Sequence, residues 1–415
     1  MVVEALIVVG CYAAFWSNLG GMAEIVRPLI FASLLLAAFW ALASSKMQRV
    51  LPTPTEFLLY AIGLLSGIVS LVRSEDYCIY YTMYFLAILV FTSVITRTLS
   101  LERLMDLGAV VTLLCIGTSL IVDGHSFVTT LRVTIGPNGI LRFSPLNNHP
   151  LLTGYIFGSG SLLLMRRVYL SRSLLERVIM SAGVLFAWAF TIAASARSSV
   201  VGLLMALGFA AVMEFRVFNR LSAKRIALGA SILTVTALVY FGFASSYLAD
   251  ILQLNSSYRG FGTGATGRTD LWMKGVQSLV SDPYLIAFGG GLRSSEYSVI
   301  GFLTENSYLT MLLDSGIFAG AALVFAIVSC PIRALRLQRS RAPSEPNTLI
   351  CLASFFIFSI VQCFFIRNFI GIGNPTSLLT LLFLISLSMR TAPDRRASRQ
   401  PVRNNVETSL ARARP

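Results

Sequence analysis

The stretch Phe31-Ala32-Ser33-Leu34-Leu35-Leu36-Ala37-Ala38-Phe39-Trp40 decides the fold class, because it contains nine apolar residues and no charge. A strand of a membrane-spanning β-barrel would alternate apolar and polar residues, and this stretch does not. The apolar run that surrounds it, residues 28–44, is long enough to cross a bilayer as a helix, which takes about 17–25 residues. The stretch therefore predicts a transmembrane helix.

Runs of the same kind recur along nearly the whole chain of 415 residues. The composition agrees, because 55% of the residues are hydrophobic and 13% are charged, whereas soluble domains have about 25% charged residues. We predict an all-α integral membrane protein with about twelve transmembrane helices in one domain, residues 1–389, and a basic, disordered cytoplasmic tail, residues 390–415. The predicted spans are residues 2–17, 28–44, 56–72, 77–95, 107–122, 150–165, 178–194, 198–213, 226–243, 307–330, 348–366 and 375–389.

The basic residues predict the orientation of these helices. With the N-terminus inside, the inner loops and the tail contain 23 of the 33 Lys and Arg residues, as expected for the cytoplasmic side. We therefore expect a multi-pass protein of a bacterial inner membrane with both termini in the cytoplasm. The net charge of +14 then reflects topology and contact with anionic lipid headgroups, and does not indicate nucleic-acid binding. Two long connections face outward, residues 123–149 and 244–306.

The cysteines and histidines do not show the spacing of a metal site or a disulfide framework. All six cysteines lie inside apolar spans without a CxxC or a Cys/His pattern, so we interpret them as small hydrophobic residues. The two histidines, His125 and His149, lie in the first long outer segment. We expect neither a metal ion nor another cofactor.

The second long outer segment contains a predicted amphipathic helix over residues 268–280. Thr269 is expected to cap its start, Asp270 suits the positive end of the helix dipole, and Asp282-Pro283 ends it. We expect this helix to lie on the outer membrane surface or to cap the bundle. Helical spacing places four apolar residues on one face: Trp272, Val276, Leu279 and Val280.

Charged residues at a membrane boundary are expensive and are therefore candidates for function. Arg197 lies in a tight link between two predicted spans, and Arg268 opens the amphipathic helix, where free backbone N–H groups also attract anions. Because a guanidinium pairs with phosphate or carboxylate through two parallel hydrogen bonds, both arginines are candidate anion ligands. The alternatives are a topological anchor at Arg197 and a solvated loop residue at Arg268.

Glu305 is the last acidic residue before the span that is predicted to start at residue 307. A carboxylate there can accept a proton from an attacking hydroxyl, or it can serve only as a helix-start acid that the dipole favours. Glu305 is thus a candidate catalytic residue together with Arg197 and Arg268, with these alternatives open. The candidate substrate-binding residues are Arg142, His149, Arg293, Asn306 and Tyr308.

Four segments on the predicted outer side form an ordered set of motifs over about residues 130–330. They are Arg142-Phe143 through Asn148-His149-Pro150, then Ser195-Ala196-Arg197-Ser198, then Arg268-Thr269-Asp270-Leu271-Trp272 with Asp282-Pro283 and Gly289-Gly290-Gly291, and last Glu305-Asn306-Ser307-Tyr308-Leu309 with Asp314-Ser315-Gly316-Ile317. Together they resemble the motifs of the O-antigen ligase and polysaccharide polymerase superfamily, including its "GRT-x-x-W" block and its "H-N-S-Y-L" helix entrance.

This resemblance implies a glycosyltransferase on the outer face of the cytoplasmic membrane that uses no nucleotide sugar and requires no metal. Its donor would be a glycan on undecaprenyl diphosphate. An acceptor hydroxyl attacks the anomeric carbon, and the arginines that match Arg197 and Arg268 stabilise the departing diphosphate. Ligases of the family carry His where this chain has Glu305, which favours a polymerase of exopolysaccharide or O-antigen. The implied partners are membrane lipids, with a flippase and a chain-length regulator as further candidates.

Other functions remain open from the sequence. They are ligation of O-antigen to lipid A-core, transport or flipping of lipid-linked sugars by a twelve-helix protein, and a non-catalytic role in an export complex. A transporter would place polar groups near the middle of the membrane and use broken helices. The centres of the predicted spans are almost free of charge, and acids and arginines gather at one side, which favours a one-sided site.

Overall fold

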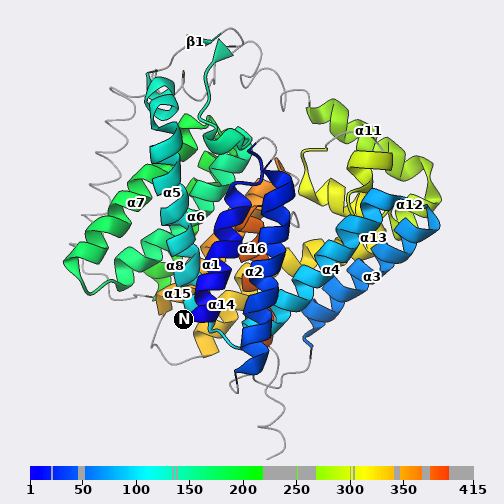
Figure 1. Cartoon of the computed structure of the whole chain (residues 1–415), viewed down its shortest axis with the longest axis horizontal. Helices are drawn as coiled ribbons and strands as arrows, with labels where there is room; N and C mark the ends of the chain where they lie inside the picture. Colours follow the sequence, from blue (N-terminus) through cyan, green and yellow to red (C-terminus); the bar gives the residue numbers. More distant parts are fainter. Residues whose placement is uncertain are drawn as a thin grey trace, which may run out of the picture.

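A computed structural model describes residues 1–19, 22–44, 52–132, 135–136, 139–217, 250, 268–299, 301, 304–340, 346–366 and 374–391. These residues form a helical bundle (Figure 1). The helices are α1 (Val2–Phe15), α2 (Ala23–Ala43), α3 (Pro54–Val72), α4 (Asp76–Thr96), α5 (Leu101–Leu131), α6 (Pro150–Leu170), α7 (Leu174–Ala193), α8 (Arg197–Val217), α11 (Arg268–Ser281), α12 (Pro283–Phe288), α13 (Ser307–Val328), α14 (Cys330–Ser340), α15 (Pro346–Cys363) and α16 (Pro375–Thr391). A 3-10 turn (Pro145–Asn147), a π-helical turn (Ser295–Val299) and the antiparallel strands β1 (Ile135–Gly136) and β2 (Gly139–Ile140) complete the description.

The prediction of an all-helical membrane protein is confirmed in its main feature. Six helical segments of the described chain are long and apolar enough to cross a membrane, and four shorter apolar helices accompany them. Eleven of the twelve predicted spans overlap described helices, whereas the predicted span 226–243 lies outside the described residues. The six segments are Glu24–Ala43, Pro54–Val72, Asp76–Thr96, Leu101–Leu131, Leu174–Ala193 and Ser307–Gln338.

Three predicted boundaries are wrong, because hydropathy shows where an apolar run ends and not where a helix ends. The connection predicted to begin at residue 123 starts later, since α5 continues through a distorted residue, Asp123, as far as Leu131. Arg333, predicted in an inner loop, lies in α14. The predicted tail also begins inside α16, where Arg390 donates to the Glu102 carboxylate over 2.6 Å; residues 392–415 lie outside the described part.

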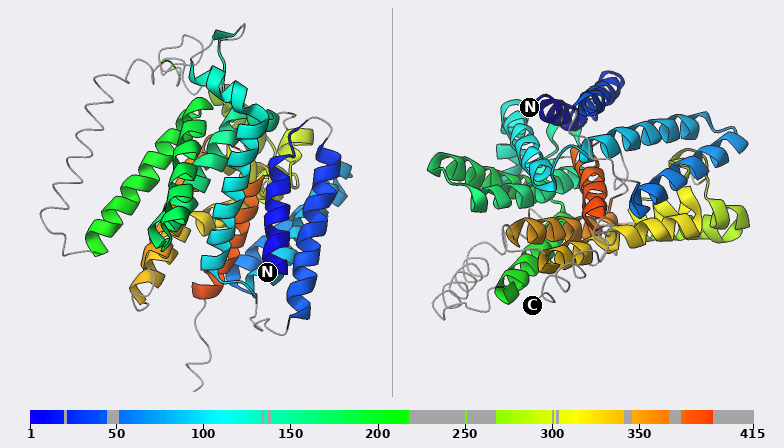
Figure 2. Two further views of the ribbon diagram at one scale, coloured as in Figure 1. Left: turned by 60° about the vertical axis from the view of Figure 1, so that its left-hand side comes forward. Right: turned by 90° about the horizontal axis from the view of Figure 1, so that it is seen from below.

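Two helices, α6 and α16, form the centre of the bundle. Nearly all residues of Leu151–Leu164 and of Leu378–Leu387 are buried, as expected for helices that are surrounded by protein. Helix α16 contacts α1, α3, α4, α5, α6 and α14, and it lies near the middle of the bundle when viewed from below (Figure 2).

The helices at the perimeter of the bundle instead expose large apolar side chains, as lipid-facing helices do. In α2 the small side chain of Ala37 is buried, whereas Phe39 is 66% exposed and Trp40 is 53% exposed. The apolar stretch that predicted a transmembrane helix therefore has one face on the bundle and one face outside it.

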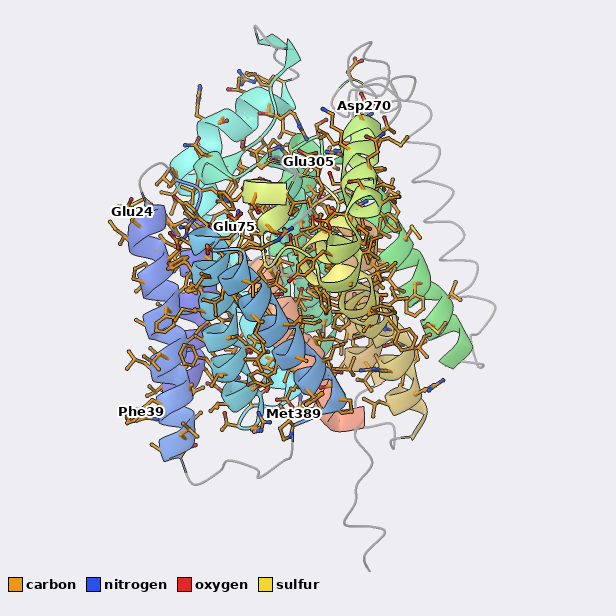
Figure 3. The ribbon with its side chains drawn as sticks, turned by 90° about the vertical axis from the view of Figure 1, so that its right-hand side faces the viewer. Glu24, Phe39, Glu75, Asp270, Glu305 and Met389 are labelled. Atoms are coloured by element: carbon orange, nitrogen blue, oxygen red, sulfur yellow. The ribbon has the colours of Figure 1, made fainter. Side chains whose placement is uncertain are left out.

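The two ends of the bundle differ in composition. Figure 3 shows Glu24, Glu75, Asp270 and Glu305 toward one end, and Phe39 and Met389 toward the other. We refer to these as the Glu305 end and the Met389 end. Arginines from loops that the sequence predicts on the inner side pair with acids beside the Met389 end: Arg97 with Glu56 at 3.0 Å, and Arg103 with Glu4, Arg166 with Asp106 and Arg390 with Glu102 at 2.6 Å each.

Candidate functional site

Arg268 and Glu305, two of the three residues predicted to be catalytic, form an ion pair at the Glu305 end. The Nε atom of Arg268, the first residue of α11, donates to Oε2 of Glu305 over 2.6 Å. The Arg268 side chain is 16% exposed and the Glu305 side chain is 32% exposed, so the pair is partly shielded from solvent. Among the described residues, the terminal nitrogens of Arg268 have no hydrogen-bond partner, which leaves these donors to an incoming anion.

The backbone of Glu305 adopts a left-handed conformation, with φ of +48°. This conformation costs a non-glycine residue about 1–2 kcal/mol, and such strain is concentrated at functional sites. The following residue, Asn306, caps α13 by accepting from the Leu309 N–H over 3.1 Å. The Ser307 hydroxyl donates to the Ile366 carbonyl, so the entrance of α13 is held in place immediately after Glu305.

Tyr308 also fixes this entrance. Its hydroxyl donates to the Ile360 carbonyl over 2.8 Å, and its ring packs edge-on against Phe364. Asn306 and Tyr308, which the sequence proposes as substrate ligands, therefore both have structural partners in this state of the protein.

Trp272 holds α11 against the segment that leads to Glu305, because its indole N–H donates to the Thr304 carbonyl over 3.0 Å. The amphipathic helix predicted over residues 268–280 is confirmed as α11, but its buried face is different from the prediction. Gly275 and Leu279 are buried, whereas Val276 is 46% exposed and Val280 is 68% exposed. The buried face of the helix therefore runs through Gly275 and Leu279.

The start of α11 also differs from the prediction. Thr269 was expected to cap the helix, but α11 already begins at Arg268, so Thr269 lies in its first turn. The predicted stop at Asp282-Pro283 is confirmed, and Asp282 there caps the next helix, α12, by accepting from the Tyr284 N–H over 2.9 Å.

A small second core joins these elements to the first turns of α13. Its buried members are Leu279, Leu285, Leu309 and Leu313, and Trp272, Ile286, Leu312 and Val299 pack against them. We refer to residues 268–299 as the cap. Because the cap has its own apolar core on α13, Arg268 and Glu305 are held on one packed unit, although they are far apart in sequence.

The glycine run Gly289-Gly290-Gly291 is docked against a break in α13. Gly316 has φ of +78°, which interrupts the helix and frees carbonyl groups one turn earlier. Gly290 donates to the Leu313 carbonyl and Gly291 to the Asp314 carbonyl, each over 2.9 Å. A Cβ atom at Gly289 would lie 2.5 Å from the Asp314 carbonyl, so only glycine permits this approach. The run is therefore held against α13 by backbone hydrogen bonds.

Asp314 binds the loop that follows the glycine run. Its buried carboxylate accepts from the backbone N–H of Arg293 over 2.8 Å, from the N–H of Ser295 over 3.1 Å, and from the Ser294 hydroxyl over 3.3 Å. Arg293 has φ of +67°, and its side chain forms an ion pair with Glu296. Asp314 thus fixes the backbone of Arg293, a candidate substrate-binding residue. In the sequence, Asp314 stood out only as part of a motif.

A second group of predicted residues surrounds the link between α7 and α8. Arg142 donates from Nε to the Ala194 carbonyl over 2.9 Å and from a terminal nitrogen to the Ser195 carbonyl over 3.2 Å. It thereby clamps the turn, with Ser195 in a left-handed conformation, that presents Arg197 as the first residue of α8. His149 caps α6 by accepting from the Leu151 N–H over 3.4 Å.

The end of α15 connects the two groups. Gln362 is fully buried, and its side-chain oxygen accepts from the hydroxyls of Ser199 over 3.1 Å and Ser198 over 3.4 Å, in the first turn of α8. The carbonyl of Ile360, in the same turn of α15, accepts from Tyr308 of α13. The turns that carry Arg197 and Glu305 therefore rest on one helix end. Sequence reasoning missed Gln362, although an amide inside an apolar span is a signal that could have found it.

Among the described residues, no three His, Cys, Asp or Glu side chains are grouped to hold a metal ion. The six cysteines have free thiols, and five of them are buried.

No protein-family model matches the chain, and no curated protein matches it significantly.

Proposed function

We propose that the chain is a twelve-span protein of a bacterial inner membrane, with both termini in the cytoplasm and the Glu305 end facing outward. The distribution of Lys and Arg along the sequence supports this orientation. The ion pairs of Arg97, Arg103, Arg166 and Arg390 with acids near the Met389 end agree with it, since they gather the inner-side arginines at one end.

We further propose that the protein is a glycosyltransferase that polymerises undecaprenyl-diphosphate-linked oligosaccharide units for exopolysaccharide or O-antigen synthesis. The single observation that carries this proposal is the Arg268–Glu305 pair, in which a cation and a carboxylate meet in a partly shielded position at the Glu305 end. Transfer from a lipid diphosphate needs a cation for the leaving group and a base for the attacking hydroxyl. Both groups are present on one side of the bundle.

In this mechanism the acceptor hydroxyl forms a bond to the anomeric carbon while the bond from that carbon to the diphosphate oxygen breaks. The hydroxyl proton passes to the Glu305 carboxylate. The terminal nitrogens of Arg268 bind the diphosphate, while its Nε continues to orient Glu305. A fixed cation in a shielded site stabilises the developing negative charge, because it needs little reorganisation during the reaction.

Arg197 is assigned the second contact to the diphosphate. Its turn is clamped by Arg142 and lies on the same end of α15 as the entrance of α13. A diphosphate carries two phosphoryl groups, so two arginines match its charge.

The experiment that tests this proposal is deletion of the gene followed by carbohydrate analysis of the lipid-linked fraction. Single repeat units that accumulate on the carrier in the outer leaflet support a polymerase. Full-length polymer that remains on the carrier would indicate a ligase instead. Single units confined to the inner leaflet would indicate a flippase and contradict the proposal.

A transporter of lipid-linked sugars is the second candidate, and the break in α13 at Gly316 favours it, because transporters use interrupted helices near their substrate sites. In this chain, however, the carbonyl groups freed by the break are bonded by the glycine run of the cap. The break therefore has a structural role, and the polymerase remains the better supported function.

A further inference from the structure

A cluster of tyrosine rings lies beside the cap and takes no part in the proposed chemistry. Tyr77 and Tyr81, in the first turns of α4, meet Tyr297 from the π-helical turn. The rings of Tyr77 and Tyr297 stack with centroids 5.1 Å apart and planes at 11°, and those of Tyr81 and Tyr297 with centroids 6.1 Å apart and planes at 17°. The cluster is open to its surroundings, since Tyr77 is 64% exposed and Tyr297 is 42% exposed.

Charged groups hold this cluster in place. The guanidinium of Arg293 lies 4.2 Å from the ring centroid of Tyr81 and 5.3 Å from that of Tyr297. Its Nε donates to Glu296 over 2.9 Å, and its backbone N–H is bound by Asp314.

The first turns of α4 contain four tyrosines, and they differ in their partners on other elements. Tyr80 and Tyr84 stack on each other, and Tyr84 bonds to the Arg27 carbonyl of α2, as expected for aromatic residues that anchor helices at a membrane interface. Tyr77 and Tyr81 are four residues apart on the other side and face Tyr297 and Arg293. Tyr81 also touches the first pair, because the Tyr80 ring packs edge-on against it with centroids 5.6 Å apart, and the Arg27 guanidinium lies 5.9 Å from its ring centroid. What distinguishes Tyr77 and Tyr81 is their contact with Tyr297, next to Arg293, which pairs with Glu296.

We propose that Tyr77, Tyr81 and Tyr297, with Arg293 and Glu296, form a carbohydrate-binding platform. The negative face of an aromatic ring attracts the weakly positive C–H groups on one side of a pyranose. Tyr77 stacks on Tyr297 and is still 64% exposed, so part of its ring surface stays open to such a ligand. The guanidinium and the carboxylate supply a donor and an acceptor for the sugar hydroxyls. Three of its members, Arg293, Glu296 and Tyr297, belong to the same cap as Arg268, so the platform and the proposed transfer site share one structural unit.

The identity of the bound glycan as the growing polymer rests on the proposed function, but binding itself can be measured without transfer. The full-length protein is placed in nanodiscs of phosphatidylethanolamine and phosphatidylglycerol. The probes are oligosaccharides of one to six repeat units, released by mild acid from the surface polysaccharide of the source cells. Titration calorimetry gives the Kd, and saturation-transfer NMR reports which sugar protons contact aromatic rings.

We expect Tyr77→Ala and Tyr297→Ala each to weaken binding about 2- to 12-fold, which is the range for loss of one aromatic contact. Tyr297→Phe keeps the ring and should retain most of the affinity, which excludes general unfolding as the cause. Tyr169→Ala, which removes another exposed tyrosine from the end of α6, is the matched control and should bind as the wild type does.

The possible results separate this inference from the proposed function. Binding that Arg268→Ala retains and Tyr77→Ala weakens supports the platform, even if no transfer activity is found. An unchanged Kd in both tyrosine-to-alanine variants would show that the rings are membrane anchors only and would overturn the platform, even if the enzyme polymerises glycan. Absence of any binding by the wild type would also overturn it.

Discussion

Substitution of Glu305 by Gln tests whether its carboxylate acts on the substrate or only stabilises the protein. The amide is close to the carboxylate in shape and can still accept the hydrogen bond from Nε of Arg268, but it is not a base. We expect Glu305→Gln to fold and insert normally and to make little polymer. Glu305→Asp keeps a carboxylate at a shorter reach and should retain partial activity.

A catalytic Glu305 and a purely structural Glu305 predict effects of very different size. A general base contributes about 10²–10⁴-fold to the rate of proton transfer. A purely structural Glu305 would contribute about 0.3–1 kcal/mol through the helix dipole, and an ion pair that is one-third exposed adds about 0.2–1 kcal/mol at most. A structural role therefore predicts a slight loss of thermal stability and a nearly normal rate, whereas a catalytic role predicts a rate that falls at least 100-fold.

The assay compares initial rates of polymerisation by purified protein in proteoliposomes, with the lipid-diphosphate-linked repeat unit as substrate, and records thermal unfolding for each variant. Glu24→Gln is the matched control, because Glu24 is an acid near the start of another helix at the Glu305 end. Polymer of normal amount and length from Glu305→Gln would refute the catalytic role and leave a mechanism that depends on the arginines alone.

Arg268→Lys and Arg197→Lys keep the charge but lose the two-pronged geometry, so each should slow transfer, and alanine at either position should slow it further; normal polymer from both alanine variants at wild-type protein levels would remove these residues from the site. Asp314→Ala leaves the N–H groups of Arg293 and Ser295 unpaired, and at about 1–3 kcal/mol for each group we expect the unfolding free energy to fall by about 2–6 kcal/mol; an unchanged melting temperature in detergent would contradict the role of Asp314 in holding the cap. A cysteine introduced at Ser256 should react with an impermeant thiol reagent in intact spheroplasts, because the segment 244–306 is expected to face outward, and labelling only after lysis would reverse the proposed topology.

The sequence alone determined that this protein is a helical membrane protein, because each helix satisfies its own backbone hydrogen bonds and the apolar runs record where lipid or protein surrounds them. It also predicted the amphipathic helix α11 and its end at Asp282-Pro283, since these depend on local spacing and on proline chemistry. The same local information identified Arg268 and Glu305 as candidates, but it could not show that they are paired.

Only the tertiary structure decided which residues meet. The pairing of Arg268 with Glu305 depends on the packing of the cap on α13, and the direction of Arg293 depends on Asp314 and on a helix break at Gly316. The buried face of α11 is centred on Gly275 and not on the valines, because the neighbouring helices determine which side comes closest. Contacts of this kind join residues that are distant along the chain, and their geometry is a property of the packed bundle that no local pattern contains.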